Sequence, residues 1–204
     1  GLSALLQQYA QDHTGTFGIS IIELSGSGRR ASYNDTKLFT SASTYKLFVA
    51  YSVLKRIEDG SWNWNDSDIS EGRNLSTCFD DMIVRSDNAC AEAMAEKIKY
   101  SVVTSEAHAI GCNDTSFGDS NGMNTTSADL ALFLAQLQMG QILKQQENRD
   151  ILLNAMARNI YRNGIPAGLS SMPVADKVGF LDGYLHDASI VYSPSGTYVL
   201  TIMT

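Results

Sequence analysis

The sequence predicts an α+β fold in which the two ends of the chain form an antiparallel sheet and the middle is largely helical. Short apolar strand patterns occur at 17–24 and 30–33 and again beyond residue 172, whereas the region between them has helical periodicity. Because strands and helices are segregated along the chain, the pattern favours α+β over a doubly wound parallel sheet.

Each end of the chain has its own predicted elements. A helix is expected to begin at Leu2, because Leu5, Leu6 and Tyr9 share one helical face, and the strands at 17–24 and 30–33 follow it. The other end is typical of an antiparallel meander, with a turn at 193–196. Its three strands are expected at Pro173–Phe180, Ala188–Tyr192 and Thr197–Thr204.

Composition indicates one catalytic unit. The 204 residues are 44% hydrophobic and 18% charged, include only three prolines and contain no Gly/Ser-rich linker, so one sizeable core is expected. We expect a single domain over 1–204, with the sheet part at about 1–40 and 172–204 and the helical part at about 41–171. The net charge of -7 argues against a nucleic-acid partner.

The first motif with chemical meaning is Ser43-Thr44-Tyr45-Lys46. Ser43 lies where a polar run gives way to an apolar helical pattern, so its oxygen is expected near free backbone N–H groups at a helix start. Lys46 follows one turn later on the same face and is placed to act as a base. It can accept a proton only when neutral, which requires burial or a second cation such as Lys177. The structural alternative is a capping serine followed by a solvated lysine.

Two further motifs strengthen the first. Ser86-Asp87-Asn88 precedes a helix-like run from 89 to 97 and is interpreted either as a helix cap or as part of a site. Lys177-Val178-Gly179 lies on a predicted strand, where a lone lysine is usually a solvated edge charge. The conjunction of all three patterns in this order favours a serine acyl-transfer site.

These motifs resemble those of serine β-lactamases and penicillin-binding proteins. The longer segments 164–169, 174–179 and 186–191 are most similar to class A β-lactamases, and 124–130 is similar to a segment that these enzymes share with D,D-peptidases. The resemblance implies a five-stranded antiparallel sheet flanked by helices, with a helical subdomain and the active site between them. The family usually continues into a C-terminal helix that is not seen after Thr204, so exposed apolar surface, or a partner that covers it, is expected there.

The resemblance also assigns roles to individual residues. Ser43 would be the nucleophile, Lys46 the base or part of its relay, and Ser86 the proton donor to the departing nitrogen. Substrate binding would involve Asn88, Lys177, Val178, Gly179 and Phe180. In detail, the backbone N–H groups of Ser43 and Phe180 would form the oxyanion hole, and Lys177 would attract a substrate carboxylate.

Two departures from the family set the expected chemistry. The segment 111–124 lacks the glutamate that activates the deacylating water in class A enzymes, and its sequence is more similar to that of D,D-peptidases. Asp119 in this segment is interpreted as a turn residue. Val178 replaces the usual Thr or Ser, whose hydroxyl would bind a substrate carboxylate. We therefore expect acylation by a β-lactam followed by slow deacylation.

Several functional alternatives remain open. A D,D-peptidase or other peptidoglycan acyl hydrolase is the second enzyme hypothesis, and a non-turnover module that senses β-lactams or cell-wall ligands is the third. The expected partner is a small β-lactam or a D-Ala-D-Ala peptide, with no nucleic acid, cofactor or metal. The resemblance implies an extracytoplasmic location, with membrane contact only through a segment outside this sequence.

The remaining candidate residues are cysteines and one histidine. Cys78, Cys90 and Cys112 fit no zinc spacing and are expected to be buried thiols or to form one disulfide. His186 is interpreted as a surface histidine, with a binding role as the alternative.

Overall fold

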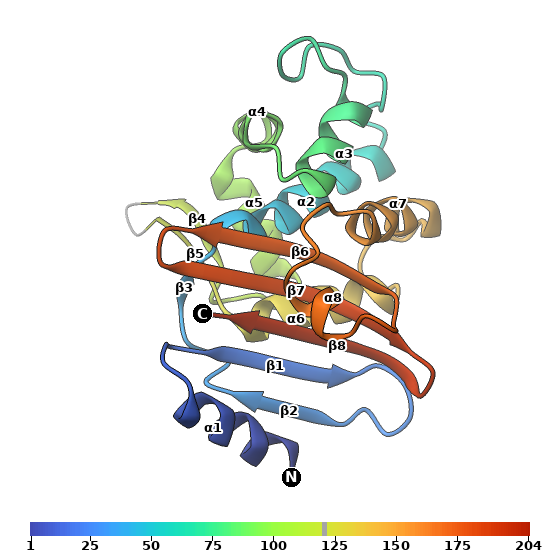
Figure 1. The fold of residues 1–204 in the computed structure, drawn as a ribbon. Helices are drawn as coiled ribbons and strands as arrows, with labels where there is room; N and C mark the ends of the chain where they lie inside the picture. Colours follow the sequence, from blue (N-terminus) through green and yellow to red (C-terminus); the bar gives the residue numbers. More distant parts are fainter. Residues whose placement is uncertain (120–121) are drawn as a thin grey trace.

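The larger sheet joins both ends of the chain. The computed structural model describes residues 1–119 and 122–204, and in it five antiparallel strands lie in the order β2-β1-β8-β7-β6 (Figure 1). The strands are β1 (Gly18–Glu23), β2 (Arg30–Tyr33), β6 (Val174–Leu181), β7 (Tyr184–Ser193) and β8 (Gly196–Met203). The predicted α+β fold with a five-stranded antiparallel sheet is confirmed.

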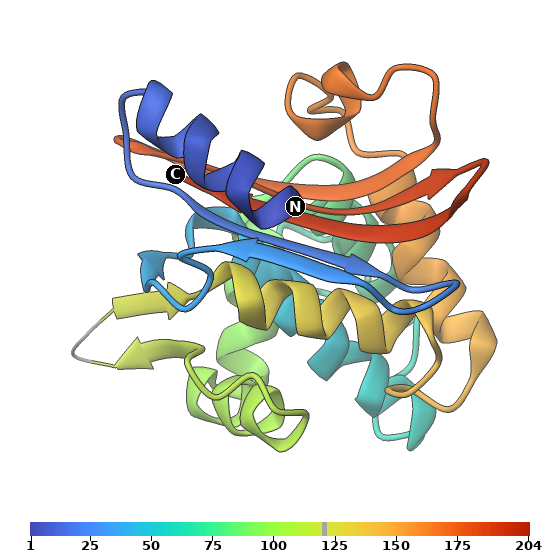
Figure 2. The same cartoon turned by 90° about the horizontal axis from the view of Figure 1, so that it is seen from below.

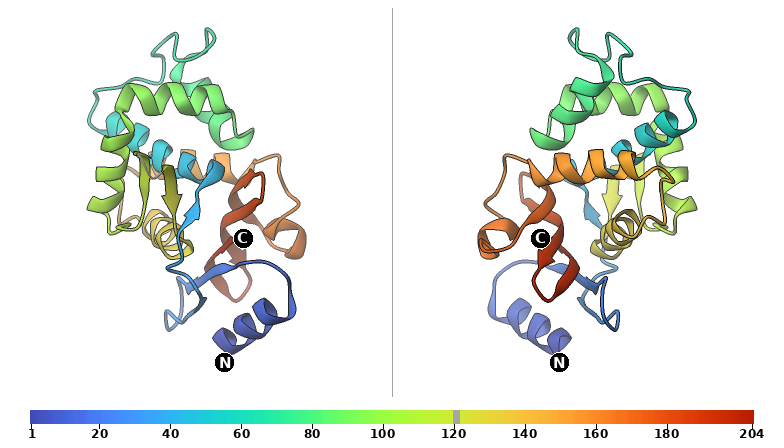
Figure 3. Two further views of the ribbon diagram at one scale, coloured as in Figure 1. Left: turned by 90° about the vertical axis from the view of Figure 1, so that its left-hand side faces the viewer. Right: turned by 90° about the vertical axis from the view of Figure 1, so that its right-hand side faces the viewer.

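Helices cover the two faces of this sheet unequally. The helical part comprises α2 (Lys46–Glu58), α3 (Leu75–Val84), α4 (Asn88–Ile98), α5 (Tyr100–Ala109), α6 (Ser127–Gln138) and α7 (Gln146–Ala157). Figure 2 shows α6 against one face, here called the inner face, while α1 (Leu2–Asp12) and the short α8 (Ile165–Gly168) lie on the other, outer face. Figure 3 shows α3 and α4 stacked beyond α2, far from the sheet edge that carries α1.

Helix α2 is the centre of the core. Its residues 47–54 are all buried, and a helix buried all round must be surrounded by other elements. Polar caps define where its neighbours begin. The side chains of Asn74, Asp87 and Thr126 accept hydrogen bonds from the backbone N–H groups of Thr77, Cys90 and Asp129, which starts α3, α4 and α6 respectively.

Two strand predictions need correction. Strand β7 begins at Tyr184, not at Ala188, because Asp182-Gly183 forms a tight turn that pairs Leu181 with Tyr184; Asp-Gly is a strong hairpin signal, and Gly183 has φ +82°. The predicted loop at 111–124 contains the hairpin β4 (Ser116–Asp119) and β5 (Gly122–Thr125), which pairs with β3 (Phe39–Thr40). The turn expected after Asp119 involves residues 120 and 121, which lie outside the described residues.

The surface role expected for His186 is wrong. The side chain is 1% exposed, because it packs between the sheet and the segment that leads into Ser43. Its Nε2 donates to the carbonyl of Thr40 at 2.8 Å, and its Nδ1 accepts from the backbone N–H of Thr204 at 3.2 Å. Burial lowers its pKa. The neutral ring is therefore a structural link between β7 and the entry to the helical part.

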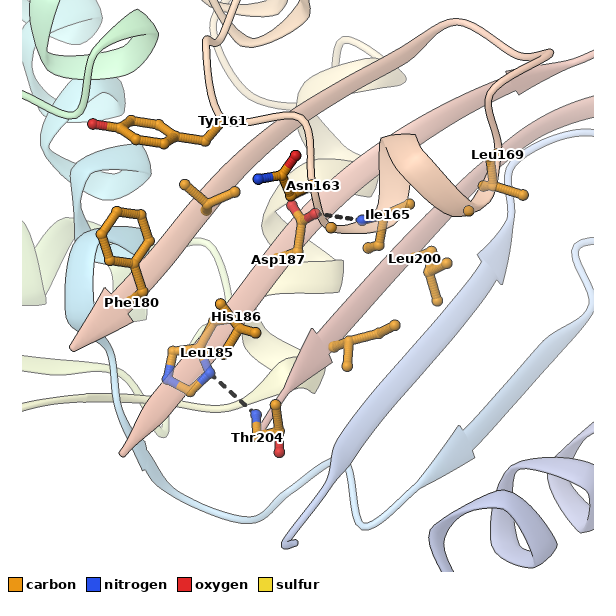
Figure 4. A pocket seen from close by; sticks show the side chains of 14 residues that line it. Tyr161, Asn163, Ile165, Leu169, Phe180, Leu185, His186, Asp187, Leu200 and Thr204 are labelled. Carbon is orange, nitrogen blue, oxygen red and sulfur yellow. Dashed lines mark hydrogen bonds between the residues drawn. The ribbon is translucent and has the colours of Figure 1, made fainter. Parts of the chain in front are cut away.

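The outer face carries exposed apolar surface, as expected. A hollow of about 540 Å³ beside α8 is lined mainly by apolar groups, including Phe180, Leu185 and Leu200 (Figure 4). Exposed apolar side chains also lie on α1, at Leu2, Leu5 and Tyr9. Of the helices in the described residues, none is long and apolar enough to cross a bilayer.

A disulfide joins the helices on either side of the Ser86 loop. Cys78 of α3 is bonded to Cys90 of α4, both are fully buried, and the 12-residue separation encloses Ser86. Cys112 is a buried free thiol that donates to the carbonyl of Asp129. Of the two cysteine states that the sequence leaves open, the structure therefore has one bridge and one thiol.

Replacing Cys78 and Cys90 together by alanine is expected to lower the free energy of unfolding by about 2–4 kcal/mol, because the cross-link restricts the unfolded chain. Thermal melting monitored by circular dichroism measures the loss. A reductant should lower the melting temperature of the wild type but leave the double variant unchanged. Equal melting of both proteins with and without reductant would contradict a structural role for the bridge.

Candidate active site

Ser43 lies in a tight 3-10 turn, η1 (Ala42–Tyr45), that leads directly into α2. The turn is pinned by Thr44, whose N–H and hydroxyl both donate to the carbonyl of Ser41, at 3.1 and 2.6 Å. Ala42 has φ +45°, a left-handed conformation that costs a non-glycine residue about 1–2 kcal/mol. The start of the buried helix α2 thus fixes a half-buried serine in a strained turn.

Lys46 is the first residue of α2 and is completely buried. Its ammonium donates to three oxygens, which are the Ser86 carbonyl at 2.6 Å, the Ser86 hydroxyl at 3.1 Å and the Asn88 side-chain oxygen at 2.7 Å. An ammonium has three donors. The solvated lysine considered as an alternative is therefore ruled out, and Lys46 connects the Ser43 turn to the Ser86 loop.

The Ser86 loop joins α3 to α4 and is held from several directions. Asp87 caps α4 through the N–H of Cys90 at 2.8 Å and is bound by Arg73 at 3.0 Å. Ser86 itself has φ +57°, a second strained non-glycine position in the site. The capping interpretation of this motif is correct for Asp87, while Ser86 and Asn88 face Lys46.

Lys177 approaches the same serine from the sheet. It lies on the inner face of the edge strand β6, is 1% exposed, and donates to Ser86 Oγ at 2.9 Å and to the Val178 carbonyl at 3.0 Å. Gly179 follows on the same face, where a Cβ would lie 3.0 Å from the backbone nitrogen of Thr44. Only glycine lets β6 approach the Ser43 turn this closely.

The electrostatics of the site are set by burial. Burial lowers the pKa of Lys46 to about 8. Burial and then the charge of Lys46 lower the pKa of Lys177 to about 7. Burial acts to raise the pKa of Asp87, but the bonds from Cys90 and Arg73 outweigh it and the pKa is lowered, so this carboxylate stays charged. Lysines usually stay protonated at neutral pH, but with these lowered pKa values both Lys46 and Lys177 can release and take up a proton near neutral pH.

The hydroxyl of Ser86 is the meeting point of these groups. It accepts from both Lys46 and Lys177, which occupies its two acceptor positions. Its own O–H hydrogen is then directed away from both lysines and is free to donate. The arrangement can pass a proton from Lys46 through Ser86 to a third group.

The structure brings most of the predicted residues together. Lys46, Ser86, Asn88 and Lys177 form one hydrogen-bonded cluster, with Ser43 one turn before Lys46. The side chains of Val178 and Phe180 do not join it. They point to the outer face of β6 and line the hollow beside α8, where Phe180 is 52% exposed and packs edge to face against Tyr161.

Sequence reasoning missed the groups that support this cluster. Asp176 on β6, Asp187 on β7 and Asn159 after α7 are buried polar residues, and no sequence motif assigned them a role. Two signals were present. Asp176 directly precedes Lys177, and Asp187 follows His186 in a segment otherwise typical of a buried strand. Buried acids next to site residues are candidates for positioning groups.

The hairpin β4–β5 occupies the segment that lacks a glutamate. Phe117 of this hairpin packs against Tyr45 and Phe48, with ring centroids 6.1 and 5.5 Å apart. The hairpin therefore lies directly beside the helix start that carries Ser43. Residues 111–124 contain two aspartates and no glutamate.

Comparison with known proteins gives the family. The sequence model described as "Beta-lactamase enzyme family" matches residues 1–204. The chain belongs to the β-lactamase enzyme family. None of the curated proteins compared with this chain matches it.

Solved structures agree on the fold of this family member. PBP-A superposes with a TM-score of 0.92 and 22% identity, covering 99% of this chain and 86% of that one. An ancestral class A β-lactamase, from the last common ancestor of Gram-negative bacteria, gives 0.88 and 23%, with coverage of 100% and 90%. A β-lactamase from Xanthomonas campestris pv. campestris gives 0.87 and 22%, with coverage of 99% and 87%.

The lowered pKa of Lys177 predicts a pH-dependent stability. Between about pH 7, where the folded lysine loses its proton, and about pH 10, where the unfolded one does, only the unfolded state binds the proton, so stability rises with pH. The unfolding free energy of the wild type relative to Lys177→Met should therefore rise by about 1.4 kcal/mol per pH unit. Urea unfolding at pH 7, 8 and 9 measures it.

The exposed Lys144 provides a control, because Lys144→Met removes the same charge from the surface. The difference in unfolding free energy between Lys144→Met and the wild type should not change between pH 7 and pH 9. A flat difference for Lys177→Met as well would show that the buried lysine keeps an ordinary pKa.

Proposed function

We propose that this protein is a penicillin-recognising serine hydrolase that forms an acyl-enzyme at Ser43 and releases it slowly. The observation that carries the proposal is the Ser86 hydroxyl held between two buried lysines, Lys46 and Lys177. Of these, Lys46 lies one helical turn after Ser43. The family supports the same class of activity. Among the relatives, a single-residue mutant of PBP-A has been solved as an acyl-enzyme complex with penicillin G.

Acylation would begin at Lys46. In its neutral form the amine accepts the hydroxyl proton of Ser43, and Ser43 Oγ forms a bond to the substrate carbonyl carbon. The resulting oxyanion would be bound by the backbone N–H groups of Ser43 and Phe180, and each such donor is worth about a hundredfold to a thousandfold in rate. A lowered pKa of about 8 makes the neutral amine accessible near physiological pH.

Collapse of the intermediate would use Ser86. Its free hydroxyl hydrogen is donated to the departing nitrogen as the C–N bond breaks, and Ser86 recovers a proton from the Lys46 ammonium that hydrogen-bonds to it. Lys46 is then neutral again and Ser43 carries the acyl group. The proton taken from Ser43 thus ends on the leaving group, and Lys177 stabilises the transient charge on Ser86.

The proposed slow deacylation rests on the absence of a glutamate from segment 111–124. Hydrolysis of an acyl-enzyme needs a base for the attacking water, and loss of general-base catalysis costs about a hundredfold to ten-thousandfold. The glutamate-free segment with the β4–β5 hairpin supports this part of the proposal. It equally supports a D,D-peptidase or another peptidoglycan acyl hydrolase as the second candidate.

We also propose an extracytoplasmic location. The buried Cys78–Cys90 disulfide supports it, because disulfides form and persist in oxidising compartments. The peptidoglycan and antibiotic substrates of the family lie outside the cytoplasm as well.

The acyl-enzyme can be tested by intact-protein mass spectrometry. After mixing with a penicillin, we expect one covalent adduct on the wild type that persists for minutes to hours, and none on Ser43→Ala. Rapid decay with multiple turnovers would establish an efficient β-lactamase and contradict slow release. Product release from a D-Ala-D-Ala peptide would favour the peptidase. A lasting adduct with no turnover of either substrate would favour the sensor module. The absence of any adduct would refute the acylation proposal.

Val178→Thr is expected to speed acylation by a penicillin. The resemblance implies that a hydroxyl at this position binds the substrate carboxylate, although the side chain lies on the outer face of β6, because β6 is the edge strand of the sheet. A charge-assisted hydrogen bond of about 1.5–3 kcal/mol corresponds to a gain of about tenfold or more. Val178→Ala removes methyl groups without adding a hydroxyl and serves as the matched control. Equal acylation rates for Val178→Thr and the wild type would show that this residue does not limit recognition.

A further inference from the structure

A segment that crosses the edge of β6 ties the Ser86 loop to the sheet. This strap consists of residues 159–165 and passes from the end of α7 to the outer face beside α8 (Figure 1). At its helical end, the N–H of Ile160 donates to the Val84 carbonyl at 3.0 Å and the hydroxyl of Tyr161 donates to the Arg85 carbonyl at 3.2 Å. Both acceptors immediately precede Ser86.

Asp176 and Asp187 hold the strap to the sheet, Asp176 at its beginning and middle and Asp187 at its far end. The Asp176 carboxylate accepts from Asn159 at 2.6 Å and from Arg162 at 2.8 Å. Asp187 Oδ2 accepts from the N–H of Ile165 at 2.8 Å (Figure 4). Its carboxyl also lies against Gly164, where any Cβ would collide with it.

The two carboxyl groups also lie within hydrogen-bonding reach of each other. In the antiparallel register Asp187 is opposite Val178, so it shares the outer face with Asp176 two residues earlier on β6. Asp176 Oδ2 and Asp187 Oδ1 are buried and receive no hydrogen bond from a nitrogen or hydroxyl donor of the described residues. Two such oxygens can lie together only if one group is protonated and donates to the other.

The charges around the pair accommodate one negative charge but not two. Arg162 from the strap bonds Asp176 directly, and Lys177 lies on the opposite face of β6. His186, the preceding residue of β7, is bonded to Thr40 on the inner face. Burial and the neighbouring charge of Asp176 raise the pKa of Asp187 to about 8. The pair therefore holds the shared proton at neutral pH and loses it as the pH becomes alkaline.

We propose that Asp187 is a positioning residue for the contact between Ser86 and Lys177. With Asp176 it clamps the strap to β6, and the strap fixes the distance between the Ser86 loop and the strand that carries Lys177. When the shared proton is lost, the two carboxylates repel each other, and the half of the strap bound to Asp176 separates from the half bound to Asp187. The clamp is then released and the proton relay loses its geometry. The effect on catalysis rests on the proposed acylation of Ser43.

The first test needs no substrate. In the ligand-free wild type, hydrogen exchange read by NMR should show that the protection factors of the Ile160 and Ile165 amides fall at least about tenfold between pH 6 and pH 9. In Asp187→Asn the side-chain N–H replaces the shared proton, so protection should persist at pH 9. Asp182→Asn, an exposed acid in the same hairpin, is the matched control and should behave as the wild type.

The second test measures the acylation rate at pH 6.5. We expect Asp187→Ala to be about ten- to a hundredfold slower than the wild type, because misplacement of a relay group is costly, and Asp187→Asn to recover most of the rate. If Asp187→Ala does not fold, the exchange measurements on the wild type and Asp187→Asn decide. Equal protection at both pH values, or wild-type acylation by Asp187→Ala, would overturn the clamp. A wild type that is not acylated would refute the proposed function while leaving the exchange test valid.

Discussion

The shared hydrogen bond of Lys46 and Lys177 to Ser86 Oγ is the interaction on which the rest of the site depends. Placing two ammonium groups against one oxygen in a buried site is unfavourable, because both burial and mutual repulsion oppose their charges. Such a contact persists only if the surrounding structure holds all three side chains in place. The same cost makes the lysines useful, since it lowers their pKa values toward neutrality.

Three separate parts of the fold hold these side chains together against the repulsion. The fully buried helix α2 supplies Lys46, the edge strand β6 supplies Lys177, and the loop between α3 and α4 supplies Ser86. Each part is secured independently, by core packing around α2, by the close fit of Gly179 on the Ser43 turn, and by the disulfide and the Arg73–Asp87 contact beside the loop. Left-handed backbone at Ala42 and Ser86 shows that this scaffold also holds strained positions.

Strand β6 separates two ionisable centres with opposite behaviour. On its inner face Lys177 has a lowered pKa, so its contribution to stability increases above neutral pH. On its outer face Asp187 has a raised pKa, so the folded state holds an extra proton between about pH 4 and about pH 8 and its contribution to stability falls as the pH rises through that window. Lys177 therefore contributes most to stability at high pH and Asp187 at low pH. Both contributions are present together only near neutral pH, where the proton relay would operate.

Much of this arrangement follows from local sequence. The antiparallel meander, the N-terminal helix and the start of α2 after Ser43 were predictable because periodicity and turn chemistry act over a few residues. The conjunction of Ser43, Lys46, Ser86, Asn88 and Lys177 was also recognisable as one motif set. Even some misses had local signals, such as the Asp182-Gly183 turn that lengthens β7.

Other features were decided only by the tertiary structure. Burial of His186 and Lys46, the choice of Cys90 as the partner of Cys78, and the contact of Asp176 with Asp187 all depend on which distant segments pack together. A side chain's pKa and its hydrogen-bond partners are set by neighbours far away in the chain. The sequence by itself therefore determined most helices and strands and the reactive residue types, whereas packing decided which groups share a proton and which face of β6 each one occupies.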